Sequence, residues 1–239
     1  MIAFIPARYE SSRFPGKVLL EIGGKPMINH VVENAAKCDY INEVVVLTDD
    51  DRIATVAKKV DYTKIRVVSS TIGDSGSDRV CRYIKKNDIR DSFVIIQADC
   101  PDLDPMIMNS FLAGLITDES FPIHTLAYPF RADNKHDDPH DPNTVKVIID
   151  NNGKALYFSR SCIPYQGSKF FKHIGVYAFP KGLPKRFNDS NEYYTITENL
   201  EQLLWIMNGM DIKVHMVSKR LRTVDTPRDY TQFSALTMK

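Results

Sequence analysis

The sequence has few cysteines, and no two of them form a recognisable pair. Four cysteines, Cys38, Cys81, Cys100 and Cys162, are spread over 239 residues without a CxxC motif. This spacing argues against a zinc site and against a disulfide framework. It is typical of reduced thiols in a reducing compartment.

Long apolar segments are also missing. No uncharged stretch reaches the roughly 18 residues that a transmembrane helix needs. The apolar run at residues 1–6 is too short for a secretory signal peptide. The sequence therefore predicts a soluble, cytoplasmic protein with no membrane insertion.

An excess of charge of either sign is absent too. The chain has 31 Lys and Arg residues and 30 Asp and Glu residues, which gives a formal net charge of +1 at pH 7. This balance does not indicate a nucleic acid partner, so we expect none, and any anion site must be local. With 43% hydrophobic residues, the chain can bury a substantial core.

Short β-branched runs alternate with helical spacing in the first half of the chain. Strands are expected at residues 1–6, 43–48, 65–68 and 92–97. After Pro26 one helix face is formed by Ile28, Val31, Val32, Ala35 and Ala36. The alternation predicts a Rossmann-like α/β fold with a mainly parallel sheet flanked by helices. Ligands bind such sheets at the carboxyl ends of the strands.

The pattern changes after about residue 122. Strands are expected at residues 123–129, 145–149, 156–159 and 172–179, without long helices between them. We interpret residues 122–187 as a smaller, β-rich and more antiparallel insertion in one domain covering residues 1–239. The core would then be residues 1–121 and 188–239. Residues 131–142, rich in Asp, His, Asn and Pro, are expected to form an exposed loop.

A helix and a strand are expected near the end of the chain. Helical spacing relates Leu200, Leu203, Leu204 and Met207, and Gly209 follows as a stop signal. On the same helix, a separate polar face is expected for Glu198, Glu201 and Gln202. A strand at residues 212–217 then leads to a turn at Asp225.

The loop after the first strand carries three cations, Arg8, Arg13 and Lys17, together with Gly16. Arginine and lysine bind phosphate oxygens, and glycine lets backbone N–H groups approach them, so a polyanion such as a nucleotide triphosphate is a natural partner. The spacing matches neither the Walker A motif nor GxGxxG. A solvated basic loop is the alternative interpretation.

Two aspartates follow expected strands. Asp99 comes after the fourth strand and Asp225 after the last one. Two carboxylates, completed by phosphate oxygens and waters, make a common magnesium site. Each is followed by proline in a turn-like context, so both could instead cap helices.

A third candidate is the helix start at residues 74–79, with the sequence DSGSDR. A helix N-terminus with glycine and hydroxyl groups can bind a phosphate or a base edge. Simple capping of the helix is the alternative.

These segments together resemble a known family. The segments PARYESSRFPGK and GGKPMI resemble the opening signature of a family of enzymes. This family is the 3-deoxy-manno-octulosonate cytidylyltransferases, also called CMP-Kdo synthetases. The family's SGTER segment resembles DSGSDR, and its QGDEP segment stands where this chain has QADCP. Further matches in family order are NTVKVIIDNNGKALYFSRSCIP, KHIGVYAF, ENLEQLLWIMNG and VDTP. The resemblance spans nearly the whole chain.

The resemblance implies a nucleotidyltransferase fold and a homodimer. The implied reaction transfers CMP from CTP to the anomeric hydroxyl of a 3-deoxy-2-ulosonic acid, first of all Kdo, and releases pyrophosphate. The implied cofactor is Mg²⁺, bound by Asp99 and Asp225. The implied catalytic residues are Arg8, Lys17 and Asp99. The resemblance implies that the nucleotide is bound by Ala7, Arg8, Lys17, Ser77, Arg79 and Gln97. It implies that the acidic sugar is bound by Arg160, His173, Glu201 and Gln202.

The chain also departs from the family pattern. Ala98 and Cys100 replace the expected Gly and Glu beside Asp99. The stretch between Pro164 and Lys172 is shorter than in the family, and residues 191–196 do not match the usual lead into the Glu-rich helix. The last two departures fall in the sugar half, so the substrate could instead be 8-amino-Kdo or a nonulosonic acid. A non-catalytic nucleotide-binding homologue is the remaining alternative.

Overall fold

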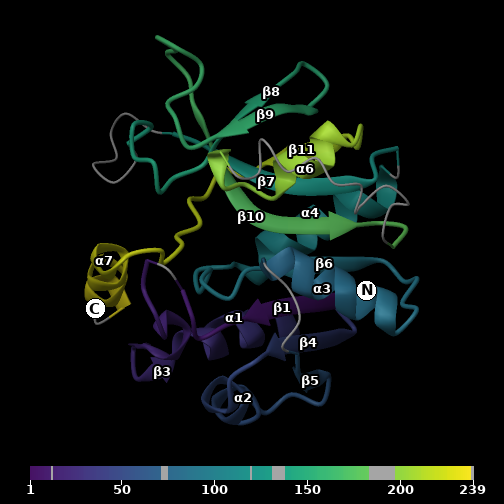
Figure 1. Cartoon of the computed structure of the whole chain (residues 1–239), viewed down its shortest axis with the longest axis vertical. Coiled ribbons are helices and arrows are strands. Elements are labelled where there is room, and N and C mark those ends of the chain that lie inside the picture. Colours follow the sequence, from purple (N-terminus) through teal and green to yellow (C-terminus); the bar gives the residue numbers. More distant parts are fainter. Residues whose placement is uncertain (12, 71–74, 119, 131–137, 183–196, 238–239) are drawn as a thin grey trace. The chain divides into compact units, whose positions relative to one another are not determined.

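The computed structural model describes residues 1–239 except 12, 71–74, 119, 131–137, 183–196 and 238–239. The described residues form two compact units (Figure 1). The first unit contains Met1–Ala113 and Leu221–Lys239, and the second unit contains Gly114–Arg220. Most of the loop expected at residues 131–142, and the unmatched residues 191–196, lie outside the described residues.

The first unit contains a parallel sheet with the strand order β6-β1-β4-β5. Its strands are β1 (Ile2–Ala7), β4 (Glu43–Thr48), β5 (Ile65–Ser69) and β6 (Phe93–Ile96). β1 pairs with β4 from Ile2 opposite Glu43 to Ala7 opposite Thr48. The strands predicted from the apolar runs are confirmed, because continuous β-branched runs suit strands that are buried on both faces.

Helices flank this sheet, as predicted. α1 (Met27–Ala36) contacts β1 and β4, α2 (Asp51–Ala57) contacts β4 and β5, and α3 (Gly76–Lys86) contacts β1. All five apolar residues of the predicted α1 face are buried. The remaining elements are the short helix η1 (Lys17–Leu19), the hairpin β2 (Glu21–Ile22) and β3 (Lys25–Pro26), and α7 (Pro227–Thr237). The boundary between the units falls within α4 (Pro105–Thr117).

The strand order creates a switch point beside β1. The chain runs from β1 to β4 and β5 on one side, and then crosses through α3 to β6 on the other side of β1. Connections leaving in opposite directions open a crevice at the carboxyl ends of the central strands, where sheets of this kind bind ligands. Arg8, Asp49 and Gln97 each follow directly on one of these strand ends.

The second unit has mainly antiparallel pairing, as predicted for this half. Its strands are β7 (Ile123–Pro129), β8 (Lys146–Ile149), β9 (Ala155–Ser159), β10 (Phe171–Phe179) and β11 (Ile212–Met216). β10 runs antiparallel to β7 and β8, and β8 runs antiparallel to β9. β11 pairs with β7 in parallel, which places the chain up to Arg220 in this unit, although the sequence analysis assigned residues 188–220 to the core.

The helix expected around residues 198–207 is interrupted. Asn199 has a φ of 53°, in the left-handed region, and the regular helix α6 covers only Gln202–Met207. The prediction that Glu198 shares a helical face with Glu201 and Gln202 is therefore wrong. The predicted apolar stripe is also partly wrong, because Met207 is 37% exposed while Trp205, outside the stripe, is buried between Tyr177 and Phe179.

Candidate functional site

The basic loop after β1 is closed by Gly16. The Gly16 N–H donates to the Tyr9 carbonyl at 2.8 Å, and Gly16 has a φ of 70°. A Cβ atom at Gly16 would lie 2.9 Å from the Tyr9 ring, so only glycine fits both the backbone and the space. The guanidinium of Arg52 lies 3.6 Å from the centroid of the same ring. The contacts between Tyr9 and Gly16 therefore fix the backbone immediately before Lys17.

Lys17 places its ammonium group between two carboxylates. Nζ donates to Asp99 Oδ2 at 2.7 Å and lies 3.5 Å from Asp225 Oδ1. It also donates to the Val224 carbonyl at 2.9 Å. The Lys17 side chain is only 9% exposed. Burial on its own lowers the pKa of Lys17, but the negative charges of Asp99 and Asp225 outweigh burial and raise this pKa, so the ammonium stays charged.

Asp99 and Asp225 reach this point from distant parts of the chain. Asp99 follows β6, and the Val224 N–H donates to the Asp99 carbonyl at 2.9 Å, which fastens the segment before α7 to the end of β6. Arg13 adds a second cation, 2.7 Å from Asp225 Oδ1. Thr226 and Asp229 cap α7 reciprocally: Thr226 Oγ1 accepts from the Asp229 N–H at 3.3 Å, and the Asp229 carboxylate accepts from the Thr226 N–H at 2.8 Å. The carboxylate of Asp225 therefore faces cations.

The two carboxylates are the candidate ligands for a divalent cation. Both lie within ion-pair distance of one ammonium group, at 2.7 and 3.5 Å from Lys17 Nζ, so their negative charges are directed at the same place. The described residues contain no group of three or more His, Cys, Asp or Glu side chains suited to a metal. Phosphate oxygens and waters would have to supply the remaining ligands, which is the usual arrangement for Mg²⁺ at nucleotide sites.

The N-terminus of α3 lies over the ends of β1 and β6. Ser75 caps the helix by accepting from the Asp78 N–H at 3.1 Å, so the capping interpretation is correct for this residue. A Cβ atom at Gly76 would lie 3.1 Å from Pro6 Cγ and 3.2 Å from Gln97 Oε1. The first turn of α3, with the buried Ser77, is thus close to the predicted nucleotide residue Gln97 and to Pro6, which directly precedes the predicted Ala7.

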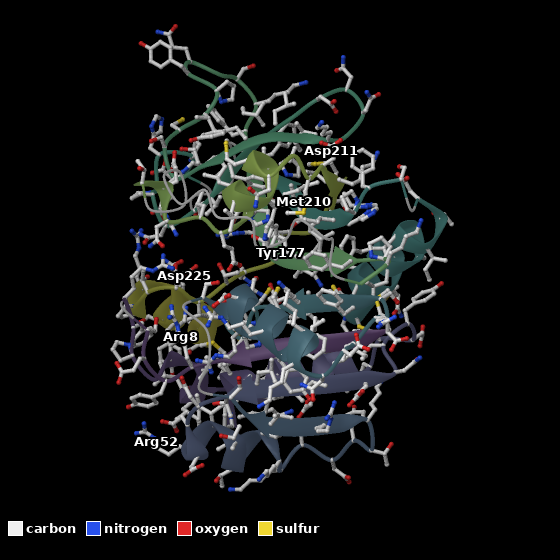
Figure 2. The ribbon with its side chains drawn as sticks, turned by 45° about the vertical axis from the view of Figure 1, so that its right-hand side comes forward. Arg8, Arg52, Tyr177, Met210, Asp211 and Asp225 are labelled. Carbon is white, nitrogen blue, oxygen red and sulfur yellow. The ribbon has the colours of Figure 1, made fainter. Side chains whose placement is uncertain are left out.

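Two further predicted nucleotide residues flank this region. Ala7 is buried at the end of β1, and Arg8, the next residue, is exposed. Figure 2 draws Arg8 and Asp225 on the same side of the first unit. An exposed arginine beside a strand end is suited to binding an anion from solution.

Arg79 makes an ion pair that the sequence analysis missed. Its Nη2 atom lies 2.7 Å from Oδ2 of Asp49, the first residue after β4. The signal available in the sequence was the position of Asp49 at the carboxyl end of a predicted parallel strand.

In the second unit, Arg160 is held by backbone oxygens. Its guanidinium donates to the carbonyls of Glu198 at 3.0 Å, Pro142 at 3.0 Å and Asn199 at 3.4 Å. Glu198 also accepts from the Arg160 N–H at 2.9 Å and from the Ser159 hydroxyl at 2.7 Å. Glu198 therefore positions Arg160, a role that helical spacing could not reveal.

His173 is buried and neutral. Its Nε2 lies 2.9 Å from Thr125 Oγ1, and the Thr125 hydroxyl donates to the Val176 carbonyl at 2.8 Å. Since that hydroxyl has one hydrogen, Nε2 of His173 is the donor and Nδ1 is left as an acceptor. Burial lowers the pKa of His173 to about 3. A neutral ring can exchange hydrogen bonds with a sugar hydroxyl but cannot neutralise a carboxylate.

Glu201 and Gln202 lie at the start of α6, with Gln202 buried and Glu201 partly buried. Burial, followed by the charge of Glu201, raises the pKa of Tyr177. Tyr177 lies against the rings of His173 and Trp205. The structure thus brings Glu201 near the aromatic cluster that contains His173, and it holds Arg160 through Glu198 within the same unit.

None of the helices in the described part of the chain is long and apolar enough to cross a membrane.

The chain is similar to known cytidylyltransferases. The sequence profile of the family described as "Cytidylyltransferase" matches residues 2–212. Proteins named 3-deoxy-manno-octulosonate cytidylyltransferase are 38% identical in Parabacteroides distasonis, with 95% of this chain and 94% of the relative covered, and 35% identical in Trichlorobacter lovleyi, with 96% and 95% covered. The relative of the same name from Escherichia coli is 34% identical over 98% of this chain and 95% of its own.

Solved structures agree with these relatives. A CMP:2-keto-3-deoxy-manno-octonic acid synthetase complexed with CTP has a TM-score of 0.87 and 33% identity, and covers 99% of this chain and 98% of its own. A glucose-1-phosphate thymidylyltransferase from Bacillus anthracis, described as putative, has a TM-score of 0.72 at 15% identity, and covers 99% of this chain and 95% of its own. The second likeness supports the fold alone.

Replacing Gly16 should cost more stability than replacing Gly23. Both glycines have a positive φ, 70° and 58°, so alanine at either position should lower the free energy of unfolding by about 1–2 kcal/mol. Only Gly16 has the Tyr9 ring against its Cβ position, whereas Gly23 has open space. Gly16→Ala should therefore lose about 1 kcal/mol more than Gly23→Ala in urea denaturation. Equal losses would show that the Tyr9 contact does not constrain the loop.

Proposed function

The chain belongs to the 3-deoxy-manno-octulosonate cytidylyltransferase family, and from that membership we propose that it transfers CMP from CTP to the anomeric hydroxyl of Kdo and releases pyrophosphate. The observation that carries the proposal is the meeting of Lys17, Asp99 and Asp225 at the strand ends of the first unit. A nucleotide triphosphate needs cations for its phosphates and carboxylates for its metal, and this group of residues supplies both.

The basic loop is the proposed triphosphate site. Arg8 is exposed at the end of β1, and Arg13 and Lys17 follow in the same loop. Arginine can contact two phosphate oxygens at once, whereas lysine acts as a point charge. Because the chain has almost no net charge, this local group must supply the attraction for CTP.

Mg²⁺ is the proposed cofactor, bound by Asp99 and Asp225. When bound, it would supply charge neutralisation at the phosphate oxygens and could lower the pKa of the attacking hydroxyl. Such an ion would compete with the Lys17 ammonium for the same carboxylate oxygens, 2.7 and 3.5 Å away. Lys17 would then be released toward the phosphates.

The proposed reaction is an in-line displacement at the α-phosphorus of CTP. A bond forms between the anomeric oxygen of the sugar and the α-phosphorus, and the bond from that phosphorus to the oxygen bridging to the β-phosphorus breaks. The electron pair of the broken bond leaves with pyrophosphate, and the hydroxyl proton passes to solvent. Positioning and charge compensation by Arg8 and Lys17 should supply most of the catalysis.

The acidic sugar is assigned to residues of the second unit. Arg160 is the cation among them, and its guanidinium is kept in place by carbonyl oxygens and by Glu198. The neutral His173 offers Nδ1 as an acceptor for a sugar hydroxyl. Glu201 and Gln202 complete the proposed set. From the sequence we also propose that the protein is a homodimer and is located in the cytoplasm.

Release of pyrophosphate tests the reaction. We expect the purified protein with CTP and Mg²⁺ to release pyrophosphate only when Kdo is added, and a reaction without sugar is the control. The short stretch between Pro164 and Lys172 makes 8-amino-Kdo and a nonulosonic acid the necessary comparison substrates. Release that is faster with one of these acids would change the assigned sugar. If no pyrophosphate is released with any of the three acids, the proposed reaction is wrong.

Loss of either carboxylate should abolish most of the turnover. Asp99→Asn and Asp225→Asn each remove one negative charge from the proposed metal site and leave a weaker, neutral amide ligand, and each should lower turnover by about 100- to 1,000-fold. With CTP present, the apparent Kd for Mn²⁺, measured by electron paramagnetic resonance, should rise by more than about tenfold.

Asp88→Asn is the control, because Asp88 is 78% exposed and forms an ion pair with the exposed Arg90. This variant should behave like the wild type. Unchanged Mn²⁺ binding in both Asp99→Asn and Asp225→Asn would remove the metal assignment.

A further inference from the structure

The guanidinium of Arg79 is buried but only partly satisfied. Its side chain is 5% exposed, and Nη2 lies 2.7 Å from Asp49 Oδ2. Nη1 is also buried and has no hydrogen-bond partner within the part of the chain that the structure describes. A buried cationic N–H group without an acceptor opposes folding, so such groups in native proteins call for an explanation. An acceptor atom of a substrate that binds next to Nη1 would supply this partner.

The Arg79–Asp49 pair lies at the edge of the sheet where CTP is proposed to bind. Asp49 directly follows β4, and Gln97 directly follows β6, on either side of β1. Arg79 lies in the first turns of α3, whose Gly76 packs on Pro6 and Gln97. Arg79 and Asp49 therefore belong to the carboxyl edge of the sheet, where CTP is proposed to bind.

The hydrogen-bonding groups of the pyrimidine ring determine whether an arginine at this position can distinguish cytosine from uracil. Cytosine presents two neighbouring acceptors, O2 and the unprotonated N3. Uracil presents O2 as well, but its N3 carries a hydrogen and is a donor. An arginine has only donors, so its N–H groups can pair with both cytosine atoms but meet a donor at N3 of uracil. This selection works only if the guanidinium is held in one orientation.

We propose that Asp49 is a positioning residue that fixes the Arg79 guanidinium through Nη2, so that Nη1 donates to the acceptor edge of the cytosine ring and disfavours uracil. The inference rests on the proposed function, since it assumes that CTP is the nucleotide. It adds a residue and a role to that function. Asp49 is 33% exposed and does not contact the base itself in this account; it acts only through Arg79.

The strand β4 carries a matched ion pair at its other end. Arg66 Nε donates to Glu43 Oε1 at 2.8 Å, and the side chains of Arg66 and Glu43 are 50% and 35% exposed. Glu43 is the first residue of β4, whereas Asp49 follows its last residue. Exposed pairs of this kind contribute little to stability. Glu43→Gln therefore controls for the loss of one carboxylate, while Asp49→Asn removes the partner of the buried guanidinium.

The test compares the binding of CTP and UTP, each by calorimetry without sugar. In Asp49→Asn the Kd for CTP should rise about tenfold, and the preference for CTP over UTP should fall by a similar factor. Asp49→Glu should recover part of the preference, and Glu43→Gln should keep all of it. Arg79→Lys, which keeps the charge but not the planar fork, should lose the preference even if Asp49→Asn fails to fold.

A wild-type preference for CTP that survives in both Asp49→Asn and Arg79→Lys would overturn the inference. A merely structural ion pair would lower the thermal unfolding temperature of Asp49→Asn without changing the ratio of the two Kd values, and this outcome also overturns it. Wild-type protein that binds neither nucleotide would refute the proposed function itself, and the inference with it. Wild-type protein that binds both equally would refute only the inference.

Discussion

The first unit depends on one buried cation shared by two carboxylates. Lys17, Asp99 and Asp225 come from three distant segments, and the ammonium of Lys17 joins them with distances of 2.7 and 3.5 Å. Removing one member of such a group leaves an uncompensated charge in a partly dry site, which is far more costly than the loss of an exposed ion pair. The loop after β1, the end of β6 and the segment before α7 are therefore constrained together. The same constraint holds together the charges that we propose bind the triphosphate and the metal.

The second unit handles polar groups differently. His173 is held neutral by burial and by Thr125, and Arg160 is held by carbonyl oxygens and Glu198. Hydrogen-bonding groups held in one orientation suit the hydroxyls proposed to bind there, because buried polar atoms that lack a correct partner are costly. In the proposed site the second unit thus combines one fixed cation, Arg160, with a neutral hydrogen-bonding ring, His173.

Much of this arrangement could be predicted from the sequence, for identifiable reasons. The bounds of β4 and β7 match the predicted strands, and β4 consists largely of buried β-branched residues, which favour extended structure. The alternation of strands and helices predicted a parallel sheet, and in such a sheet Asp99 lies at the carboxyl edge. The break at Asn199 was missed, because helical spacing continues across it and a single left-handed residue leaves no periodic signal. Pairs such as Arg79 with Asp49 were also missed, since they join separate elements whose register only the folded chain defines.

We propose that the Lys17 ammonium occupies the place of the metal in the nucleotide-free protein, and Mn²⁺ binding without nucleotide is the first experiment to make. Lys17→Met keeps most of the aliphatic stem but removes the ammonium that engages both carboxylates. We expect this variant, with its fold checked by circular dichroism, to bind Mn²⁺ more tightly than the wild type by electron paramagnetic resonance. Equal or weaker Mn²⁺ binding in Lys17→Met would contradict the claim that the ammonium and the metal compete for Asp99 and Asp225.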